Sequence, residues 1–432
     1  MSRYCIIGAG PSGLAAARAL SEARISFDVF ERHNDVGGIW DIDNPNTPIY
    51  ESAHFISSRS QSAFDGFPMP ADYPDYPSWK QILDYIRAFA DQYDLRKNIR
   101  FDTTVAKAQP DANGWTVTLG GGEVLRYDGV IAAVGHDWDP VRPEYPGSFD
   151  GASYHTVSYR SAAELAGKRV LVVGAGNSGC DIACDAATQA KESWISMRRG
   201  YWFLPKHVFG QPTDEFFHHG PQIPNWLAPS LLAVLLRVLV GDLRRLGLQK
   251  PDHKPLATHP IMNTQLLHHL AHGDIAAKPD IAELRGRTVR FTDGSEIEPD
   301  LILWATGYRP RLPFLEAGGV HLAEDGEDLY LNIFSREHPG LYVMGFFGTA
   351  GAAYPIVSKQ GALVAAVIAA KEKKNAGALR AFDELRSKPR SLLGGMRYLR
   401  SPRHAFYVQF ETYLKELDRV LASVSDRLTH RR

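Results

Sequence analysis

The sequence predicts an α/β protein with two similar parallel-sheet domains, and two observations carry this prediction. A buried strand, a glycine-rich turn and a helix of small apolar residues follow one another over Arg3–Ala23. The same order returns over Lys168–Ala190. Strands that alternate with helices in this way form parallel sheets. The 432 residues are enough for two domains, and 44% hydrophobic with 22% charged residues is the balance of a globular protein.

The first unit carries a dinucleotide-binding motif between its strand and its helix: Gly8-Ala9-Gly10-Pro11-Ser12-Gly13. Gly8 permits the tight turn, Gly10 lets a pyrophosphate approach the backbone, and Gly13 lets the helix pack close to the strand. The following strand, Ser26–Glu31, ends on a carboxylate that can accept from ribose hydroxyls and would repel a 2′-phosphate. We therefore expect this Rossmann-like unit to bind FAD or NAD.

The second unit repeats the motif, Gly174-Ala175-Gly176-Asn177-Ser178-Gly179, after another buried strand. The position that corresponds to the acid of the first unit is Met197, and Arg198 and Arg199 follow it. Two guanidinium groups at this strand end suit a 2′-phosphate through charge-assisted hydrogen bonds. The second unit is therefore predicted to bind NADPH.

Composition narrows the remaining functional classes. The net charge is −1, so nothing calls for a nucleic acid or an anionic membrane as a partner. The sixteen histidines show no ligand spacing with a partner acid, so we expect no metal site. Only three cysteines are present, Cys5, Cys180 and Cys184, which favours a reducing compartment. With the first strand starting at Arg3 there is no room for a signal peptide, so we expect a cytoplasmic protein.

The rest of the chain divides around these units. Residues 45–78 read as a long ordered loop region, and helices are expected over 78–95, 355–370 and 405–424. The apolar stretch Trp226–Val240 is too short to span a bilayer. It is expected to be a buried or cleft-capping helix, and an interfacial anchor is the alternative.

These segments give the predicted domain organisation. A first part of the FAD domain covers 1–158, an NADPH domain with a helical insertion covers 159–290, and 291–432 returns to the FAD domain and adds C-terminal helices. The NADPH domain is thus inserted in the FAD domain, and a homodimer is left open.

Several segments together resemble one family of flavoenzymes. Between the two units the pattern Phe149-x-Gly151-x-x-x-His155-x-x-x-Tyr159 resembles the fingerprint of flavin-containing monooxygenases and their Baeyer–Villiger relatives. Further segments are similar to flavin-containing monooxygenases in the same order: Glu31-Arg32, Gly37–Trp40, Phe67–Pro70, Gly174–Asp181, Phe291–Gly294 and Ala305–Tyr308. The resemblance extends from about Tyr4 to about Leu417.

The resemblance implies roles for individual residues. Gly8 to Gly13 and Glu31 would hold the ADP half of FAD, and Gly38, Ile39 and Trp40 would lie along the flavin. Gly174 to Gly179, Arg198 and Arg199 would hold NADPH. His155 would set the relative placement of the two cofactors, with a purely structural role as the alternative.

One departure from the family affects the expected chemistry. The family's active-site asparagine falls on Ile56, and an isoleucine side chain cannot donate a hydrogen bond. Either a neighbour such as His54, Ser57 or Ser58 takes over its role, or oxygen transfer is weakened. No catalytic side chain is assigned beyond these candidates.

The resemblance implies an NADPH- and O₂-dependent monooxygenase that oxygenates a soft nucleophile, an amine or a sulfide, through a C4a-hydroperoxyflavin. The alternatives are a Baeyer–Villiger monooxygenase acting on ketones, an NADPH oxidase or reductase, and a non-catalytic redox-sensing flavoprotein. Aromatic residues over 201–248 either line a cleft for a moderately apolar small-molecule substrate or belong to the core of the insertion.

Overall fold

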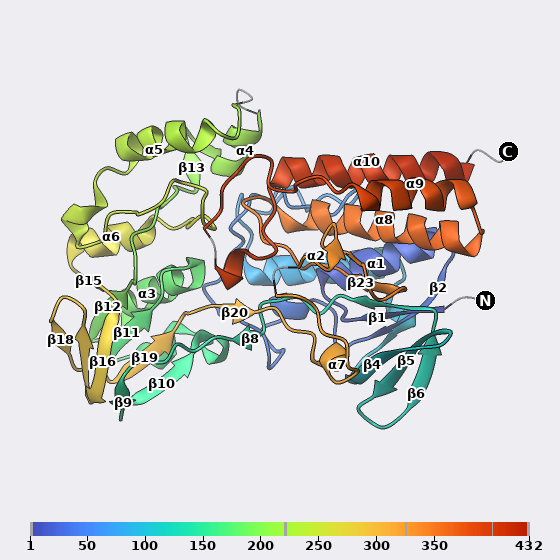
Figure 1. Ribbon diagram of the computed structural model, residues 1–432. Coiled ribbons are helices and arrows are strands. Elements are labelled where there is room, and N and C mark those ends of the chain that lie inside the picture. The colour runs from blue at the N-terminus through green and yellow to red at the C-terminus, as the bar shows by residue number, and fades with distance from the viewer. Residues whose placement is uncertain (1–2, 220–222, 325, 400, 430–432) are drawn as a thin grey trace.

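The computed structural model describes residues 3–219, 223–324, 326–399 and 401–429, and it has two lobes side by side (Figure 1). Each lobe is built on a parallel sheet with helices on one face and a smaller, mainly antiparallel sheet on the other. The chain between the two connecting strands β8 (Asp139–Pro140) and β20 (Tyr308–Arg309) forms the second lobe. The predicted α/β fold, with one nucleotide domain inserted in the other, is confirmed.

The first lobe contains a seven-stranded sheet in the order β21-β22-β23-β7-β1-β2-β3. Its strands are β1 (Arg3–Ile7), β2 (Ser26–Phe30), β3 (Ile99–Arg100), β7 (Gly129–Ala132), β21 (Leu329–Tyr330), β22 (Phe334–Ser335) and β23 (Leu341–Val343). The five strands from β23 to β3 run parallel, as βα crossovers require. Val29 and Ile131 point into the helical layer, whereas Cys5 and Val130 point to the opposite face.

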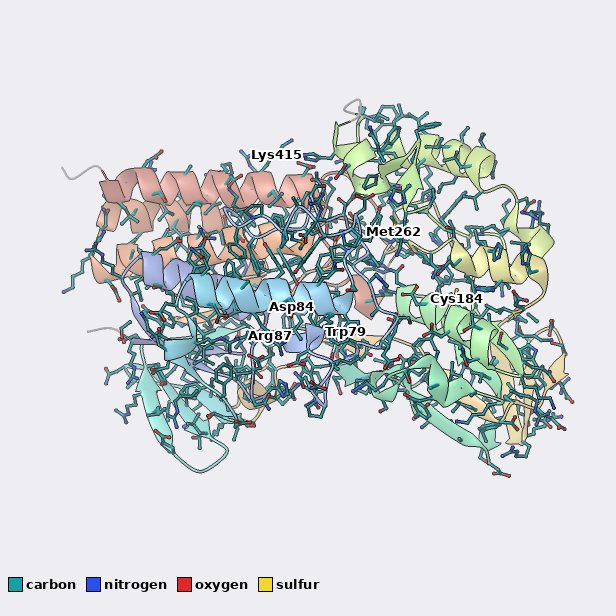
Figure 2. All side chains as sticks on the ribbon, turned by 180° about the vertical axis from the view of Figure 1, so that it is seen from behind. Trp79, Asp84, Arg87, Cys184, Met262 and Lys415 are labelled. Carbon is teal, nitrogen blue, oxygen red and sulfur yellow. The ribbon has the colours of Figure 1, made fainter. Side chains whose placement is uncertain are left out.

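Helices cover one face of this sheet and strands cover the other. The helical layer consists of α1 (Pro11–Glu22), α2 (Trp79–Gln92), α8 (Ala353–Glu372), α9 (Ala376–Ser387) and α10 (Phe410–Thr429). The opposite face is covered by α7 (Pro313–Glu316) and the antiparallel strands β4 (Val105–Asp111), β5 (Gly114–Leu119) and β6 (Val124–Tyr127). Viewed from behind, α2 runs across this lobe from Trp79 past Arg87 (Figure 2).

Helix α8 is long and apolar enough to cross a membrane by length and composition. Two thirds of its apolar window, 67%, is buried in the protein, where it packs between α1 and α10. Burial on nearly all sides explains an apolar composition without a polar stripe. α8 is therefore the central helix of the first lobe.

The second lobe repeats this layering around a five-stranded parallel sheet in the order β10-β19-β11-β12-β15. Its strands are β10 (Ala152–His155), β11 (Arg169–Val173), β12 (Glu192–Ser196), β15 (Ala276–Lys278) and β19 (Leu301–Trp304). One face packs on α3 (Asn177–Gln189) and α6 (Gln265–His272). The other packs on β9 (Gly147–Phe149), β16 (Ile281–Gly286), β17 (Thr288–Phe291) and β18 (Glu296–Ile297).

The second sheet draws strands from both sides of the range 159–290 that the sequence analysis gave to this domain. β10 precedes the range, and β19 follows it. The three predicted domain ranges stay a prediction. Sheet membership favours a wider insertion.

The insertion after β12 contains β13 (His207–Val208), β14 (Gln211–Pro212), α4 (Thr213–His219) and α5 (Ala228–Leu239). α5 buries Leu232 and Leu236 and exposes Leu231, Val234 and Val238. It is thus half-buried, which leaves the choice between a capping helix and an interfacial anchor a prediction. The aromatic residues of the insertion do not form one cleft, because Phe203 lies in the core whereas Phe209 and Trp226 are exposed.

The C-terminal region differs from the sequence prediction at two places. α9 was not predicted, and α10 begins at Phe410 rather than near residue 405. Residues 406–408 instead pair with the loop after β23, through a bridge between Tyr407 and Gly348. The buried cysteines Cys180 and Cys184 lie in the core of the second lobe, as predicted.

Candidate active site

The two glycine motifs adopt the same backbone geometry. Gly8 and Gly174 have φ angles of +103° and +108°, which side chains other than glycine rarely adopt. Each donates its N–H to the last residue of the neighbouring strand, Phe30 or Ser196, at 2.8 and 2.9 Å. A β-carbon at Gly13 or Gly179 would overlap the carbonyl oxygen of the first glycine of its own motif. Both loops therefore leave the open N-terminus of a helix free for a pyrophosphate.

In the first motif the strand-end carboxylate is already oriented. Glu31 is buried and accepts from the Ala9 N–H at 2.7 Å and from the His33 N–H at 2.9 Å. A carboxylate has further lone pairs to accept from ribose hydroxyls. Gly10 and Gly38 bring their backbones into close contact, since a β-carbon on Gly38 would lie only 3.0 Å from the Gly10 Cα. This contact places the loop of Gly38 directly beside the glycine turn that would hold the pyrophosphate of FAD.

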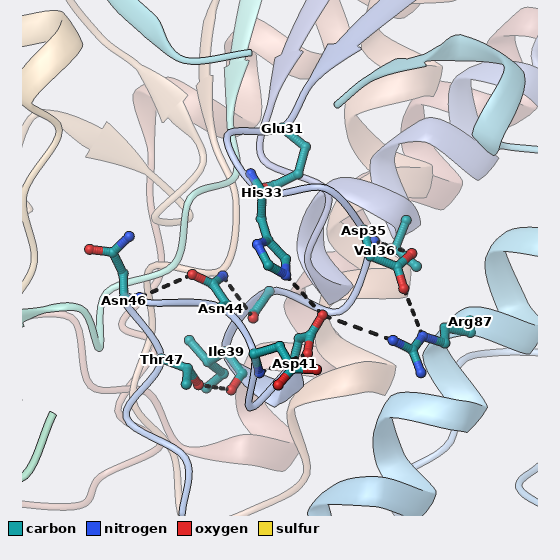
Figure 3. Close-up of polar contacts among 12 residues, drawn as sticks. Glu31, His33, Asp35, Val36, Ile39, Asp41, Asn44, Asn46, Thr47 and Arg87 are labelled. Carbon is teal, nitrogen blue, oxygen red and sulfur yellow. Dashed lines mark hydrogen bonds and ion pairs between the residues drawn. The ribbon is translucent and has the colours of Figure 1, made fainter. Parts of the chain in front are cut away.

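The segment that carries Gly38, Ile39 and Trp40 is held from behind by side chains that the sequence analysis did not single out (Figure 3). Asn44 Nδ2 donates to the Gly38 carbonyl at 3.2 Å, and the Thr47 hydroxyl donates to the Ile39 carbonyl. A hydrogen bond of 3.0 Å joins His33 Nε2 and Asp41 Oδ2 across the same loop. The first two bonds satisfy carbonyl groups of the loop and the third joins two side chains across it, so together they fix the loop's conformation.

Beyond this loop lie buried polar atoms that lack a protein partner. The Tyr354 hydroxyl and Thr349 Oγ1 have no hydrogen bond within the described residues, although both side chains are buried. Tyr354 lies against Phe55, and Phe55 contacts Trp40, with ring centroids 5.5 and 4.9 Å apart. Buried polar groups are normally hydrogen-bonded. The unsatisfied Tyr354 hydroxyl, on a ring that adjoins Phe55 and through it Trp40, fits a polar atom of a flavin ring.

In the second motif the strand end carries no acid. Met197 is buried, and Arg198 is exposed with no hydrogen bond or ion pair to any residue in the described part of the chain. Arg199 lies 3.7 Å from Asp252. Arg198 is thus free for a 2′-phosphate, whereas Arg199 has a competing carboxylate.

A polar network joins the loop of the first lobe to α3 of the second. Tyr50 donates to Asp181 at 3.0 Å, and Ser52 and Tyr159 donate to Asp185 at 2.6 and 2.9 Å. Burial raises the pKa of both carboxyl groups. The hydrogen bonds to Asp181 and Asp185 compensate part of that cost and fix α3 relative to the loop. Spacing alone did not reveal this network, because Tyr50 and Ser52 lie 131 and 133 residues from the carboxylates to which they donate.

His155 is the last residue of β10, and its side chain packs against β20, one of the two connecting strands between the lobes. Its Nδ1 accepts from the Val157 N–H at 3.1 Å, and its Nε2 donates to the Gly307 carbonyl at 3.1 Å. Tyr308 packs edge-on against the ring. Burial lowers the pKa of His155 to about 4, so the ring is neutral at pH 7. These contacts support a positioning role.

The candidates around the family's asparagine position divide by environment. Ile56 packs into an apolar cluster with Leu204, Leu236 and Met262 at the boundary between the lobes, where Figure 2 labels Met262. The His54 side chain is exposed and bonds the Ser52 carbonyl. Ser57 and Ser58 bond other serines of the loop: Ser57 accepts from Ser62, and Ser58 lies 3.2 Å from Ser60. Their part in the reaction stays a prediction.

Two dinucleotide sites with opposite charge at their strand ends define a flavoprotein oxidoreductase that also binds a nicotinamide nucleotide. The family model described as flavin-binding monooxygenase-like matches residues 1–423. Flavin-containing monooxygenase 5 of Rattus norvegicus is 34% identical over 386 residues, 83% of this chain and 72% of that protein. Dimethylaniline monooxygenase [N-oxide-forming] 2 of the same species is 32% identical over 390 residues with the same coverage.

Solved structures agree on the fold. Cyclohexanone monooxygenase from Rhodococcus sp. Phi1, bound to NADP⁺, matches with a TM-score of 0.74 at 18% identity and covers 99% of this chain and 98% of that chain. The chain belongs to the flavin-binding monooxygenase-like family. Its members are FAD-dependent enzymes that use NADPH, and the two cofactors predicted from the motifs are those of the family.

Proposed function

We propose that this enzyme uses NADPH and O₂ to oxygenate a soft nucleophile, an amine or a sulfide. The observation that carries the proposal is the pairing of two complete dinucleotide sites, one ending on Glu31 and the other on Arg198. The overall reaction consumes NADPH, H⁺, O₂ and substrate, and it yields NADP⁺, water and the oxygenated product. Bound FAD accepts the hydride and activates O₂ in this chemistry.

The residues of this chain would bind the two cofactors and position them relative to each other. Glu31 would accept from the FAD ribose, and the glycine turn at Gly8 and Gly10 would hold its pyrophosphate. Gly176 and Arg198 would hold NADPH in the second lobe. The Asp181 and Asp185 network would keep the two sites in register, which matters because hydride transfer requires close approach of the two cofactors.

The choice of substrate class rests on relatives and on one residue. A relative at 32% identity is named for N-oxide formation, which favours an amine or a similar soft nucleophile. Ile56, in its apolar cluster, offers no hydrogen bond to an oxygen species. We therefore expect part of the NADPH to be consumed without oxygen transfer.

The test measures NADPH consumed, hydrogen peroxide released and product formed with a thioether, a tertiary amine and a ketone. We expect a sulfoxide or an N-oxide, together with a peroxide leak that Ile56→Asn lowers about fivefold, the size of one hydrogen bond. Leu256→Asn places an amide elsewhere in the same apolar cluster and serves as the matched control. Lactone or ester as the main product would establish the Baeyer–Villiger alternative, and peroxide alone with all three substrates would establish an oxidase.

A further inference from the structure

A segment of the first lobe reaches across to the second nucleotide site. We call residues 388–399 and 401–409, between α9 and α10, the strap; it contains the short helix η6 (Pro402–His404). In Figure 1 it leaves the C-terminal helices and descends between the lobes toward α3. η6 also lies against the connecting strand β20. The C-terminal region therefore contributes to a site in the other lobe.

The strap is fixed on both of its sides. On the first lobe, Gly348 donates to the Phe406 carbonyl at 3.2 Å and accepts from the Val408 N–H at 2.8 Å. On the second lobe, the Leu399 N–H donates to the Ala257 carbonyl at 2.9 Å, and a hydrogen bond of 2.9 Å joins His259 Nδ1 and the Tyr407 hydroxyl. Contacts on both sides fix the backbone of η6 in place.

The residues that hold the strap are themselves tied to the second glycine motif. Asn177 Nδ2 donates to the Pro260 carbonyl at 3.1 Å, and Asn177 Oδ1 accepts from the Met262 N–H at 2.8 Å. Asn177 directly follows Gly176 and begins α3. The motif, the 257–262 segment and the strap are thus joined by consecutive hydrogen bonds.

Arg403 is the strap residue that faces the second glycine motif. Its Nη1 is 3.7 Å from the position of a β-carbon on Gly176, the glycine over which a pyrophosphate passes. The side chain is exposed and has no hydrogen bond or carboxylate partner among residues 3–219, 223–324, 326–399 and 401–429. A guanidinium without an anion that faces a glycine loop is arranged to receive one.

Two histidines lie beside Arg403. Burial, together with the Arg403 charge, lowers the pKa of His259 to about 3 and that of His404 to about 4, so both rings are neutral at pH 7. Arg199 also lies close enough to His404 to act on its pKa. The Nε2 atom of His404 is buried without a partner in the described chain. Arg403 therefore carries the positive charge here, which an entering phosphate would offset.

We propose that Arg403 binds the pyrophosphate of NADPH from the strap, which makes the C-terminal segment part of the nicotinamide nucleotide site. This inference rests on the proposed use of NADPH in the second lobe. Arg403 and Arg198 then divide the nucleotide between them, since Arg403 serves the pyrophosphate and Arg198 the 2′-phosphate.

The test measures dissociation constants by calorimetry on the FAD-loaded enzyme for three probes: NADP⁺, NAD⁺ and adenosine 2′-monophosphate, which has no pyrophosphate. Arg403→Ala is expected to weaken NADP⁺ and NAD⁺ about tenfold each, the loss of one charge-assisted hydrogen bond, and to leave the monophosphate unchanged. Arg403→Lys should recover part of the affinity. Arg397→Ala, another exposed arginine of the strap, is the matched control and should change nothing.

The outcomes separate this inference from the function it rests on. Wild-type enzyme that fails to bind NADP⁺ would overturn both. Wild-type binding with an unchanged Arg403→Ala variant would overturn only the role of Arg403. Equal weakening of all three probes, the monophosphate included, would also overturn it, because the effect would then not concern the pyrophosphate.

Discussion

The two nucleotide units share their architecture and differ at the ends of their second strands. Gly8 and Gly174 adopt nearly the same φ angle, and each following helix packs on its strand through a glycine. In the first unit the strand is followed directly by buried Glu31, which is held by two backbone N–H groups. In the second it is followed by buried Met197 and then by Arg198 and Arg199. The glycine turn is therefore generic for dinucleotides, whereas a few residues at the strand end select the nucleotide.

The two sites also differ in what closes them. The first is closed by its own loop, in which Asn44 and Thr47 fix the backbone around Gly38 (Figure 3). The second is approached by the strap from the other lobe. A locally closed site suits a cofactor that stays bound, and a site assembled from two lobes suits a nucleotide that exchanges in each turnover.

The largest expected effect comes from replacing the first glycine of each motif, in one unit at a time. A methyl group at Gly8 or Gly174 would meet the backbone of Ala133 or Ala305 at a positive φ, so we expect each alanine variant to weaken its own cofactor about 100-fold. Gly8→Ala should lower the flavin-to-protein ratio. Gly174→Ala should retain FAD and lose NADP⁺ binding in calorimetry. Gly121→Ala, with open space around it, is the control. Loss of FAD from Gly174→Ala alone would reverse the assignment of the two sites.

A smaller effect on nucleotide binding should appear when only Arg198 or Arg199, the residues that distinguish the second unit, are replaced. Arg198→Ala should raise the KM for NADPH about 30-fold and leave that for NADH nearly unchanged, because only NADPH carries the 2′-phosphate. Arg199→Ala should have a weaker effect of the same kind, since Asp252 already competes for that guanidinium. Steady-state assays with both nucleotides measure this. Equal changes for NADPH and NADH would refute the 2′-phosphate role.

The features that could be predicted from the sequence are those that local spacing determines. β1, α1 and β2 were placed to within one residue, as were β11 and α3, because apolar runs and glycine motifs define them locally. The same spacing pointed to Glu31 and Arg198 as the contrasting strand ends. Ser78 begins α2 with a capping box to Gln81, which is also a local signal.

The features that escaped prediction depend on contacts between distant segments. The hydrogen bonds of Asp181 and Asp185 come from Tyr50 and Ser52, and no periodicity in either segment indicates the pairing. The residues near 405 contain a helix-like apolar pattern, but Tyr407 and Val408 pair with Gly348 instead, so α10 starts later. Tertiary pairing overrode local propensity there.

The smallest expected effect concerns the connection between the two units, where His155 is neutral. Burial lowers its pKa in the folded protein to about 4, below the value of about 6.5 for an unfolded chain. Between these values the unfolded chain binds more protons, so the stabilisation by neutral His155 is complete above pH 6.5 and is lost as the pH falls toward 4. Asp181 and Asp185, whose pKa values are raised, act in the opposite sense, so the comparison must be made between variants.

His155→Gln removes the titrating group and keeps a donor for the Gly307 carbonyl. We expect the melting temperature of the wild type to fall about 2 °C more than that of the variant between pH 7 and pH 5. Differential scanning calorimetry at both pH values measures this difference. His268→Gln, on the exposed part of α6, is the control, because it should follow the wild type. If the variant loses as much stability on acidification as the wild type, His155 does not join the two units as a buried neutral ring, and the register of the two cofactors must then depend on the Asp181 and Asp185 network alone.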